Sequence, residues 1–264
     1  MSRFAVLVMG LLCALTAAAC VHSSYSLASH TSEYSMTSDD KEVALGRKLA
    51  KQVEKEETLV PDDAMQNRVR AIGQRLVAVC DRQELVYSFA VIKEEEVNAF
   101  SLPGGYVFLN EGLVKKVASD DELAAVIGHE IGHVVARHAM KRYEGSLGTQ
   151  LLQLATLATR SVAAAQGVSV AIQATQLAYA RQEELEADRF SVKYLKAAGF
   201  DPKATISFLE RLQQLERDKP HYLPRGVVRP EYGMTHPFVP DRLRAVKEAL
   251  YGIADYLDYL NTHD

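Results

Sequence analysis

Cysteine is scarce in this sequence: its 264 residues contain three, at positions 13, 20 and 80. Cys13 lies inside an N-terminal apolar run and Cys20 ends it, so we expect Cys80 to be the single thiol of the mature chain. One thiol cannot form an internal disulfide, and no other residue completes a metal site around it. Because Cys80 falls within an apolar helical pattern, we expect a small, buried hydrophobic side chain there.

An excess of positive charge is also lacking. Lys and Arg number 30 and Asp and Glu number 34, which gives a formal net charge of -4. A nucleic-acid-binding protein should carry a basic stripe, and none is visible, so no nucleic-acid partner is expected. The composition, 48% hydrophobic and 24% charged, is ordinary for a globular chain.

The sequence has one uninterrupted apolar run, residues 4–15, which is too short to span a bilayer comfortably. Arg3 precedes it and the small residues 17–19 follow it, an order typical of a secretory signal over residues 1–20. The end of this segment resembles the bacterial lipoprotein box, with Ala17 in place of the usual leucine. That resemblance implies lipidation of Cys20 and, since Val21 is not aspartate, an outer-membrane lipoprotein facing the periplasm. The alternative is a soluble periplasmic protein, cleaved after Ala19.

The rest of the chain divides into a tether and one domain. Residues 21–38 are rich in Ser, Thr and His without periodicity, which predicts a flexible tether. Residues 39–264 are expected to form a single domain, mainly helical with a small sheet. Helices are predicted from residue 39, over 62–80, and over 120–142, 146–178, 180–199, 202–217 and 240–260. Strands are predicted around 87–91, 98–102 and 106–109, the last two joined by a Pro-Gly-Gly turn.

Residues 147–178 are Ala- and Leu-rich, but several Gln residues and Arg160 interrupt them. Because a central arginine is costly in lipid, we interpret this stretch as a helical hairpin packed on the domain rather than a membrane-inserted segment.

The segment from His129 to His133 reads H-E-I-G-H. Four residues apart on a helix, His129 and His133 lie one turn apart on one face and can reach a single zinc ion. Glu130 then lies close enough to accept a proton from a water that the metal activates. The flanking residues are apolar, so three polar side chains would be buried at a cost that a metal ion would offset. The alternative is a solvated helix face that carries these residues by chance.

A third ligand must come from elsewhere. No histidine lies six residues after His133, so a third histidine ligand at that spacing is excluded. His138 lies off the ligand face, and we interpret it as structural. Residues 183–188 read E-E-L-E-A-D and offer glutamates on a later helix, with Asp188 one turn after Glu184. Asp188 could then accept the outer N–H of a ligating histidine and fix its orientation. By itself this acidic turn could equally be a charged, solvated face.

Four motifs occur in order: NAFSLPGGYV from Asn98, HEIGH from His129, RQEELEAD from Arg181, and Thr235-His236-Pro237 with Arg242. Together they resemble the HtpX-like and CaaX-prenyl-protease-like zinc metallopeptidases, metallopeptidase family forty-eight, over about residues 40–250. The resemblance implies an α+β, mainly helical, zincin-like (gluzincin) domain with one Zn²⁺ per chain. It selects Glu184, over Glu183 and Glu186, as the third ligand.

The resemblance also implies a function, a zinc-dependent endopeptidase that cleaves exported or misfolded envelope proteins, with outer-membrane assembly machinery as a candidate partner. The strand of Val107, Phe108, Leu109 and Asn110 would line the cleft and pair with an extended polypeptide substrate. His236 would lie near the zinc, either donating to the oxyanion or occupying the open position and holding the enzyme inactive. The alternative function is an outer-membrane-associated chaperone or binding module with a latent metal site.

Overall fold

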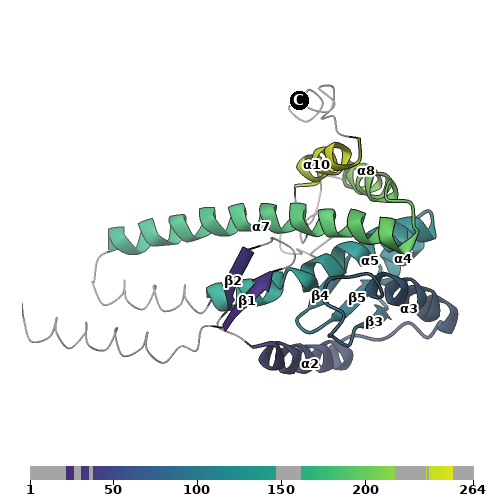
Figure 1. Ribbon diagram of the computed structural model, residues 1–264, viewed down its shortest axis with the longest axis horizontal. Helices are drawn as coiled ribbons and strands as arrows, with labels where there is room; N and C mark the ends of the chain where they lie inside the picture. The colour runs from purple at the N-terminus through teal and green to yellow at the C-terminus, as the bar shows by residue number, and fades with distance from the viewer. Residues whose placement is uncertain are drawn as a thin grey trace, which may run out of the picture.

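A computed structural model describes residues 22–26, 31–35, 38–146, 162–217, 236 and 238–251 of the chain. Figure 1 shows a mainly helical body with a small sheet on one side and the long helix α7 crossing it. The helices are α2 (Asp39–Glu56), α3 (Asp63–Val77), α4 (Glu111–Lys116), α5 (Asp120–Val135), α7 (Val162–Ala198), α8 (Ala204–Arg217) and α10 (Val239–Tyr251). The expected fold class is confirmed.

The sheet contains β3 (Ser88–Ile92), β4 (Ala99–Leu102) and β5 (Tyr106–Asn110) in the order β3-β5-β4. β3 runs parallel to β5, and β4 runs antiparallel to it. Gly104 and Gly105 have φ of 75° and 95°, so the predicted Pro-Gly-Gly turn takes a left-handed backbone that glycine adopts without strain. All three predicted strands are therefore confirmed.

The position of β5 corrects one expectation. We expected Val107 to Asn110 to form an edge that a substrate could join, but β5 is the central strand, hydrogen-bonded on both sides. The outer edge of β3 is partly covered, since the amide of Val60 donates to Val91 O at 3.0 Å and Gln66 also bonds Val91. The edge beside α5 belongs to β4 instead.

Helix α5 begins with reciprocal capping: Ser119 Oγ accepts from the amide of Glu122, and a Glu122 carboxylate oxygen accepts from the amide of Ala118. From Leu123 to Val135 every residue is buried, between α3, α7, α8 and the sheet. We predicted one helix over 120–142. The structure instead ends α5 at Val135 and resumes helix over 138–146, because Arg137 takes a left-handed backbone with φ of 58°.

Helix α7 packs along α5 and carries the acidic turn of residues 183–188. We predicted a break between two helices near residue 179, and the structure shows one continuous helix there. Residues 147–161, the first part of the expected hairpin, lie outside the described residues. Within the described part of the chain, no helix combines the length and apolar character needed to cross a membrane.

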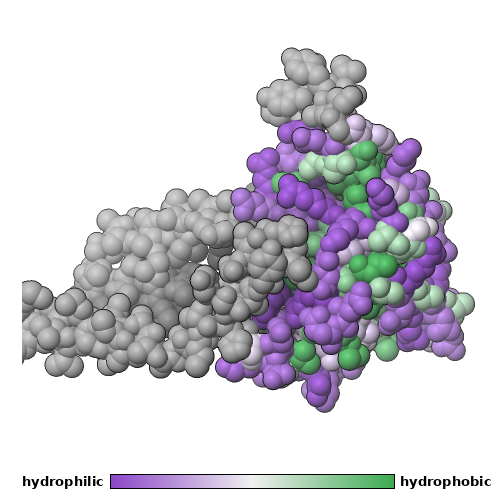
Figure 2. Space-filling model, in the orientation of Figure 1, coloured by the Kyte–Doolittle hydropathy of each residue, from purple (hydrophilic) through white to green (hydrophobic). Residues whose placement is uncertain are grey.

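Much of the N-terminal region, residues 1–21 with Cys20, also lies outside the described residues. Within the segment expected to be a tether, β1 (His22–Ser26) and β2 (Thr31–Ser35) pair antiparallel, where we had expected no regular structure. On the face shown in Figure 2, the described residues are mainly hydrophilic, with hydrophobic residues in small groups among them. Such a surface is what amphipathic helices around a buried core produce.

Candidate metal centre

Helix α5 brings His129 and His133 together. Their Nε2 atoms lie 3.0 Å apart, and the two residues are buried, with Glu130 between them. The side chains converge because four residues advance an α-helix by about one turn. Two imidazole nitrogens this close must share either a proton or a cation, since two lone pairs would repel each other.

Helix α7 brings Glu184 against this pair. Its Oε2 lies 3.3 Å from His129 Nε2 and its Oε1 lies 3.4 Å from His133 Nε2. The approach depends on Gly128 and Gly132, because a Cβ on Gly132 would lie only 2.9 Å from the carbonyl oxygen of Ala187. Gly128, just before the H-E-I-G-H segment, and Gly132 within it therefore set the separation of the two helices.

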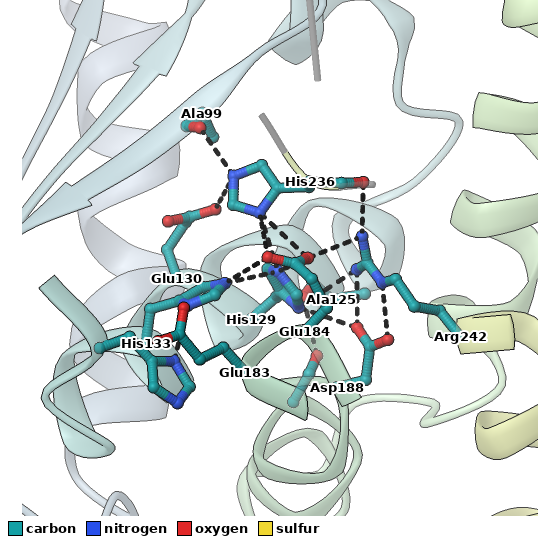
Figure 3. Close-up of polar contacts among 12 residues, drawn as sticks. Ala99, Ala125, His129, Glu130, His133, Glu183, Glu184, Asp188, His236 and Arg242 are labelled. Atoms are coloured by element: carbon teal, nitrogen blue, oxygen red, sulfur yellow. Dashed lines mark hydrogen bonds and ion pairs between the residues drawn. The ribbon is translucent and has the colours of Figure 1, made fainter. Parts of the chain in front are cut away.

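His236 completes the cluster from the segment before α10. Its Nδ1 lies 3.3 Å from His129 Nε2 and 3.2 Å from both carboxylate oxygens of Glu184. Its Nε2 points the other way, 3.3 Å from the carbonyl oxygen of Ala99 on β4 and 3.4 Å from Glu130 Oε1. Figure 3 shows His236 between the sheet edge and the α5–α7 pair.

These four residues can hold a metal ion. One ligand atom from each of His129, His133, Glu184 and His236 lies within 4.8 Å of the others, and all four residues are buried. Three imidazoles and one carboxylate are donors of the type that zinc takes. The donor set therefore fits a divalent transition metal.

A buried ion pair stands behind the cluster. Asp188 Oδ1 lies 2.8 Å from His129 Nδ1, and Arg242 holds both oxygens of Asp188 while its Nη1 lies 3.1 Å from Glu184 Oε2. Burial raises the pKa of Asp188, but the charge and hydrogen bonds of Arg242, together with those of His129, lower it more, to about 2. Asp188 is thus a carboxylate, able to accept the Nδ1–H of His129 and leave its Nε2 facing the centre (Figure 3).

The surroundings shift the pKa values of His129 and His133 in opposite directions. Burial and the Arg242 charge lower the pKa of His129, but Asp188 and Glu184 raise it more, to about 9. Burial instead holds the pKa of His133 well below its ordinary value. Burial raises the pKa of Glu184, but the charge of His236 and hydrogen bonds with the histidines lower it far more, so Glu184 is ionised.

Glu130 differs from every other carboxylate of the site. It is fully buried, and neither of its oxygens has a hydrogen-bond partner among the described residues apart from the longer contact with His236. An orphaned buried carboxylate is costly and is retained where it has a chemical task.

The other acidic residues of the turn face elsewhere. Glu183 Oε2 bonds Arg142 Nε at 2.8 Å, and Glu186 Oε2 lies 3.2 Å from His138 Nε2. Of the three glutamates, Glu184 alone joins the cluster. The predicted substrate residues Val107, Phe108, Leu109 and Asn110 lie on the central strand, and His236 contacts β4 rather than β5.

Sequence reasoning missed two neighbours of the centre. Arg242 was noted within a motif without a role, and its contacts span four residues of the site: Glu184, Asp188, His129 and His236. His138 is not part of the four-residue cluster, in agreement with its interpretation as off the ligand face, but the sequence did not indicate that its Nδ1 lies 2.8 Å from His133 Nδ1. Its position depends on the left-handed turn at Arg137, which no helical periodicity reveals.

Comparison with known proteins agrees with this geometry. The chain is 32% identical over 235 residues to the putative beta-barrel assembly-enhancing protease of Vibrio cholerae, covering 83% of this chain and 47% of that protein. It is 31% identical over 224 residues to the beta-barrel assembly-enhancing protease of Escherichia coli, covering 81% and 44%.

It is also 29% identical over 182 residues to the mitochondrial metalloendopeptidase OMA1 of Schizosaccharomyces pombe, covering 69% and 52%. The chain spans about half the length of these curated relatives. The sequence pattern of peptidase family M48 matches residues 63–250, which include all four cluster residues. On the extent of that match and on these relatives, the chain belongs to peptidase family M48.

Proposed function

We propose that this chain is a zinc-dependent endopeptidase acting on exported polypeptides. The observation that carries the proposal is the orphaned carboxylate of Glu130, fully buried beside a cluster of metal-binding side chains. A purely structural metal site has no use for an adjacent unpartnered base, whereas hydrolysis of a peptide bond requires one.

His129, His133 and Glu184 would hold one zinc ion per chain, and Asp188 would orient His129. When bound there, the ion supplies Lewis acidity, which polarises a scissile carbonyl and makes water more acidic. Glu130 is placed to accept the proton of the attacking water on a carboxylate oxygen and to return it to the leaving amine.

His236 carries two candidate roles. Nδ1 faces Glu184 and His129, which favours a fourth donor that occupies the open position until a substrate displaces it. Nε2 faces β4 and Glu130, the side from which a substrate would approach, which would suit a donor to the oxyanion. His236→Ala should raise basal turnover under the first role and lower it under the second; unchanged turnover would contradict both.

The outer edge of β4 is the surface we propose for the substrate backbone. The amide of Asn110 donates to Asn98 O at 2.9 Å, so in the antiparallel register the hydrogen-bonded pairs alternate from there. Ala99 and Ser101 therefore direct their main-chain groups away from β5, toward the side where His236 lies. An extended peptide could add to this edge and place its carbonyl near the metal centre.

The proposals for location and partners are supported by the N-terminal sequence and by the names of the relatives. We propose that residues 1–20 direct export, that Cys20 is lipidated, and that the enzyme faces the periplasm from the outer membrane. Two relatives are named for enhancing β-barrel assembly, which supports misassembled envelope proteins as substrates and the assembly machinery as a partner.

The function is tested with Glu130→Gln, which keeps the size of the side chain and removes its basicity. The variant should bind as much zinc as wild type and cleave casein about 10²- to 10⁴-fold more slowly, the usual worth of a general base. Equal cleavage by the two zinc-loaded proteins would refute the mechanism. Complementation of a deletion strain by Glu130→Gln would favour instead a chaperone or binding module with a latent metal site.

A further inference from the structure

A second chain of hydrogen bonds leads away from the metal centre through His133. His133 Nδ1 lies 2.8 Å from His138 Nδ1, and His138 Nε2 lies 3.2 Å from Glu186 Oε2. His138 is 1% exposed, while Glu186 lies at the partly exposed end of the chain. Nothing in the proposed mechanism uses either residue.

The carboxylate sets the direction of every hydrogen bond in this series. An ionised Glu186 only accepts, so the nitrogen that faces it, His138 Nε2, must carry a hydrogen. In a neutral His138, Nδ1 is then the acceptor, and the hydrogen between the two Nδ1 atoms must belong to His133. His133 therefore has its hydrogen on Nδ1 and a lone pair on Nε2, the atom that faces Glu184 and His129.

The opposite arrangement is disfavoured at the Glu186 end, and at the other end it blocks metal binding. If His138 Nδ1 donated, its Nε2 lone pair would face the lone pairs of Glu186. His133 would then carry its hydrogen on Nε2, which could not bind a metal until that proton was lost.

The backbone places His138 for this contact. Helix α5 ends at Val135 and Arg137 takes the left-handed conformation, which returns His138 to the side of His133. Arg137 is held in turn by ion pairs with the buried Glu42, 3.0 Å away, and with Asp39, 3.2 Å away. A non-glycine residue at positive φ costs energy and persists only where its surroundings require it.

We infer that His138 and Glu186 are positioning residues that hold His133 in the Nδ1–H tautomer and so keep its Nε2 ready for the metal. The inference rests on the proposed metal site. Glu186 would act on His133 through His138, whereas Asp188 contacts His129 directly. Partners of this kind fix the tautomer and orientation of a ligating histidine, and their loss typically weakens metal binding about 10- to 100-fold.

The first measurement is the tautomer itself. In metal-free full-length protein near neutral pH, ¹⁵N–¹H correlation spectra of the imidazole rings should show the hydrogen of His133 on Nδ1. Glu186→Lys replaces the acceptor with a donor, so it should reverse the series and move that hydrogen to Nε2. Ala197→Lys, at an exposed position about three turns further along the same helix, adds a positive charge away from Glu186 and His138 and should leave the tautomer unchanged.

The second measurement is zinc affinity, by competition with a chromogenic chelator and Zn²⁺ alone. His138→Phe removes the acceptor while nearly keeping the volume, and should raise the Kd for zinc about 10- to 100-fold. His138→Asn places an amide oxygen near the position of Nδ1 and should recover most of the lost affinity, which a merely space-filling role would not predict. If His138→Phe does not fold, the zinc affinity of Glu186→Lys provides the same test, because the side chain of Glu186 is partly exposed.

The outcomes separate this inference from the proposed function. A wild-type His133 with its hydrogen on Nε2, or zinc affinity unaffected by both His138→Phe and Glu186→Lys, would overturn the positioning role even if the protein cleaves casein. The predicted tautomer together with the predicted loss of zinc affinity would support it even if the protein cleaves nothing.

Discussion

Arg242 holds Asp188 with two hydrogen bonds, from Nε to Oδ2 at 2.8 Å and from Nη2 to Oδ1 at 2.7 Å, and both side chains are almost fully buried. The same guanidinium lies 3.1 Å from Glu184 Oε2, so one cation balances two carboxylates that face the candidate metal centre. The contact joins the acidic face of α7 to α10.

Replacing this cation should cost much of the stability of the protein. Arg242→Met leaves two buried carboxylates without their cation, so the unfolding free energy of metal-free protein should fall by about 3–5 kcal/mol. Urea unfolding measures the change. Arg244→Met, two residues away and partly exposed, is the matched control, expected within about 0.5 kcal/mol of wild type. Equal losses in the two variants would show that the buried pair has no special role.

The close contact of α5 with α7 gives a second prediction. A Cβ at Gly132 would lie 2.9 Å from Ala187 O and 3.0 Å from Ala187 Cα, so Gly132→Ala must push α7 away from α5. Overpacking of this kind should lower the unfolding free energy by about 1–3 kcal/mol. It should also weaken zinc binding, because Glu184 lies one turn before Ala187 on α7.

Gly145 provides the control for that substitution. It lies in the helix over 138–146, and an added Cβ would meet no atom within 4 Å. Gly145→Ala should therefore raise the unfolding free energy by about 0.5–1 kcal/mol through helix propensity alone. Thermal or urea unfolding compares the two. A Gly132→Ala protein as stable as Gly145→Ala would mean that the helices separate without cost.

The N-terminal cap of α5 predicts a dependence of stability on pH. Burial raises the pKa of Glu122, but hydrogen bonds from Arg211, the Ala118 amide and Ser207 lower it below the ordinary 4.5. The unfolded chain therefore takes up a proton at higher pH than the folded protein does. The stabilisation is complete above the ordinary pKa and is lost as pH falls through the lowered one.

Glu122→Gln tests this linkage. The difference in unfolding free energy between wild type and variant should shrink as pH falls from about 6 to about 3. Ser119→Ala removes the neighbouring cap without removing the carboxylate, so it should cost about 1 kcal/mol at each pH. Urea unfolding across this range measures both, and a Glu122→Gln difference that stays constant with pH would contradict the role of the ion pair with Arg211.

The outer edge of β4 can be tested with proline. In the register of the sheet, the amide of Ser101 faces away from β5, so Ser101→Pro removes a donor to a substrate without removing a bond of the sheet. Loss of such a bond, worth about 0.5–1.5 kcal/mol, should raise KM for peptide substrates at least about twofold. Ser101→Ala keeps the amide and should leave KM unchanged. Equal KM values for the proline and alanine variants would place the substrate elsewhere.

Features set by neighbouring residues were determined by the sequence alone. The four-residue spacing of His129 and His133 puts both imidazoles on one helix face wherever that helix packs. The Pro-Gly-Gly turn joins two strands because glycine tolerates the positive φ the turn requires, and the acidic helix of residues 183–188 follows from its own periodicity. The selection of Glu184 among three glutamates needed the family resemblance in addition.

Only the tertiary structure decided which strand is an edge, since strand order depends on contacts between distant segments and β5 has the alternation of any strand. It likewise turned Glu184 toward the histidines, Glu183 toward Arg142 and Glu186 toward His138. His138 joined the site through one left-handed residue, Arg137, held by the distant Glu42. Helical periodicity cannot anticipate such a residue, because its conformation is stabilised by ion pairs from α2 rather than by its own sequence.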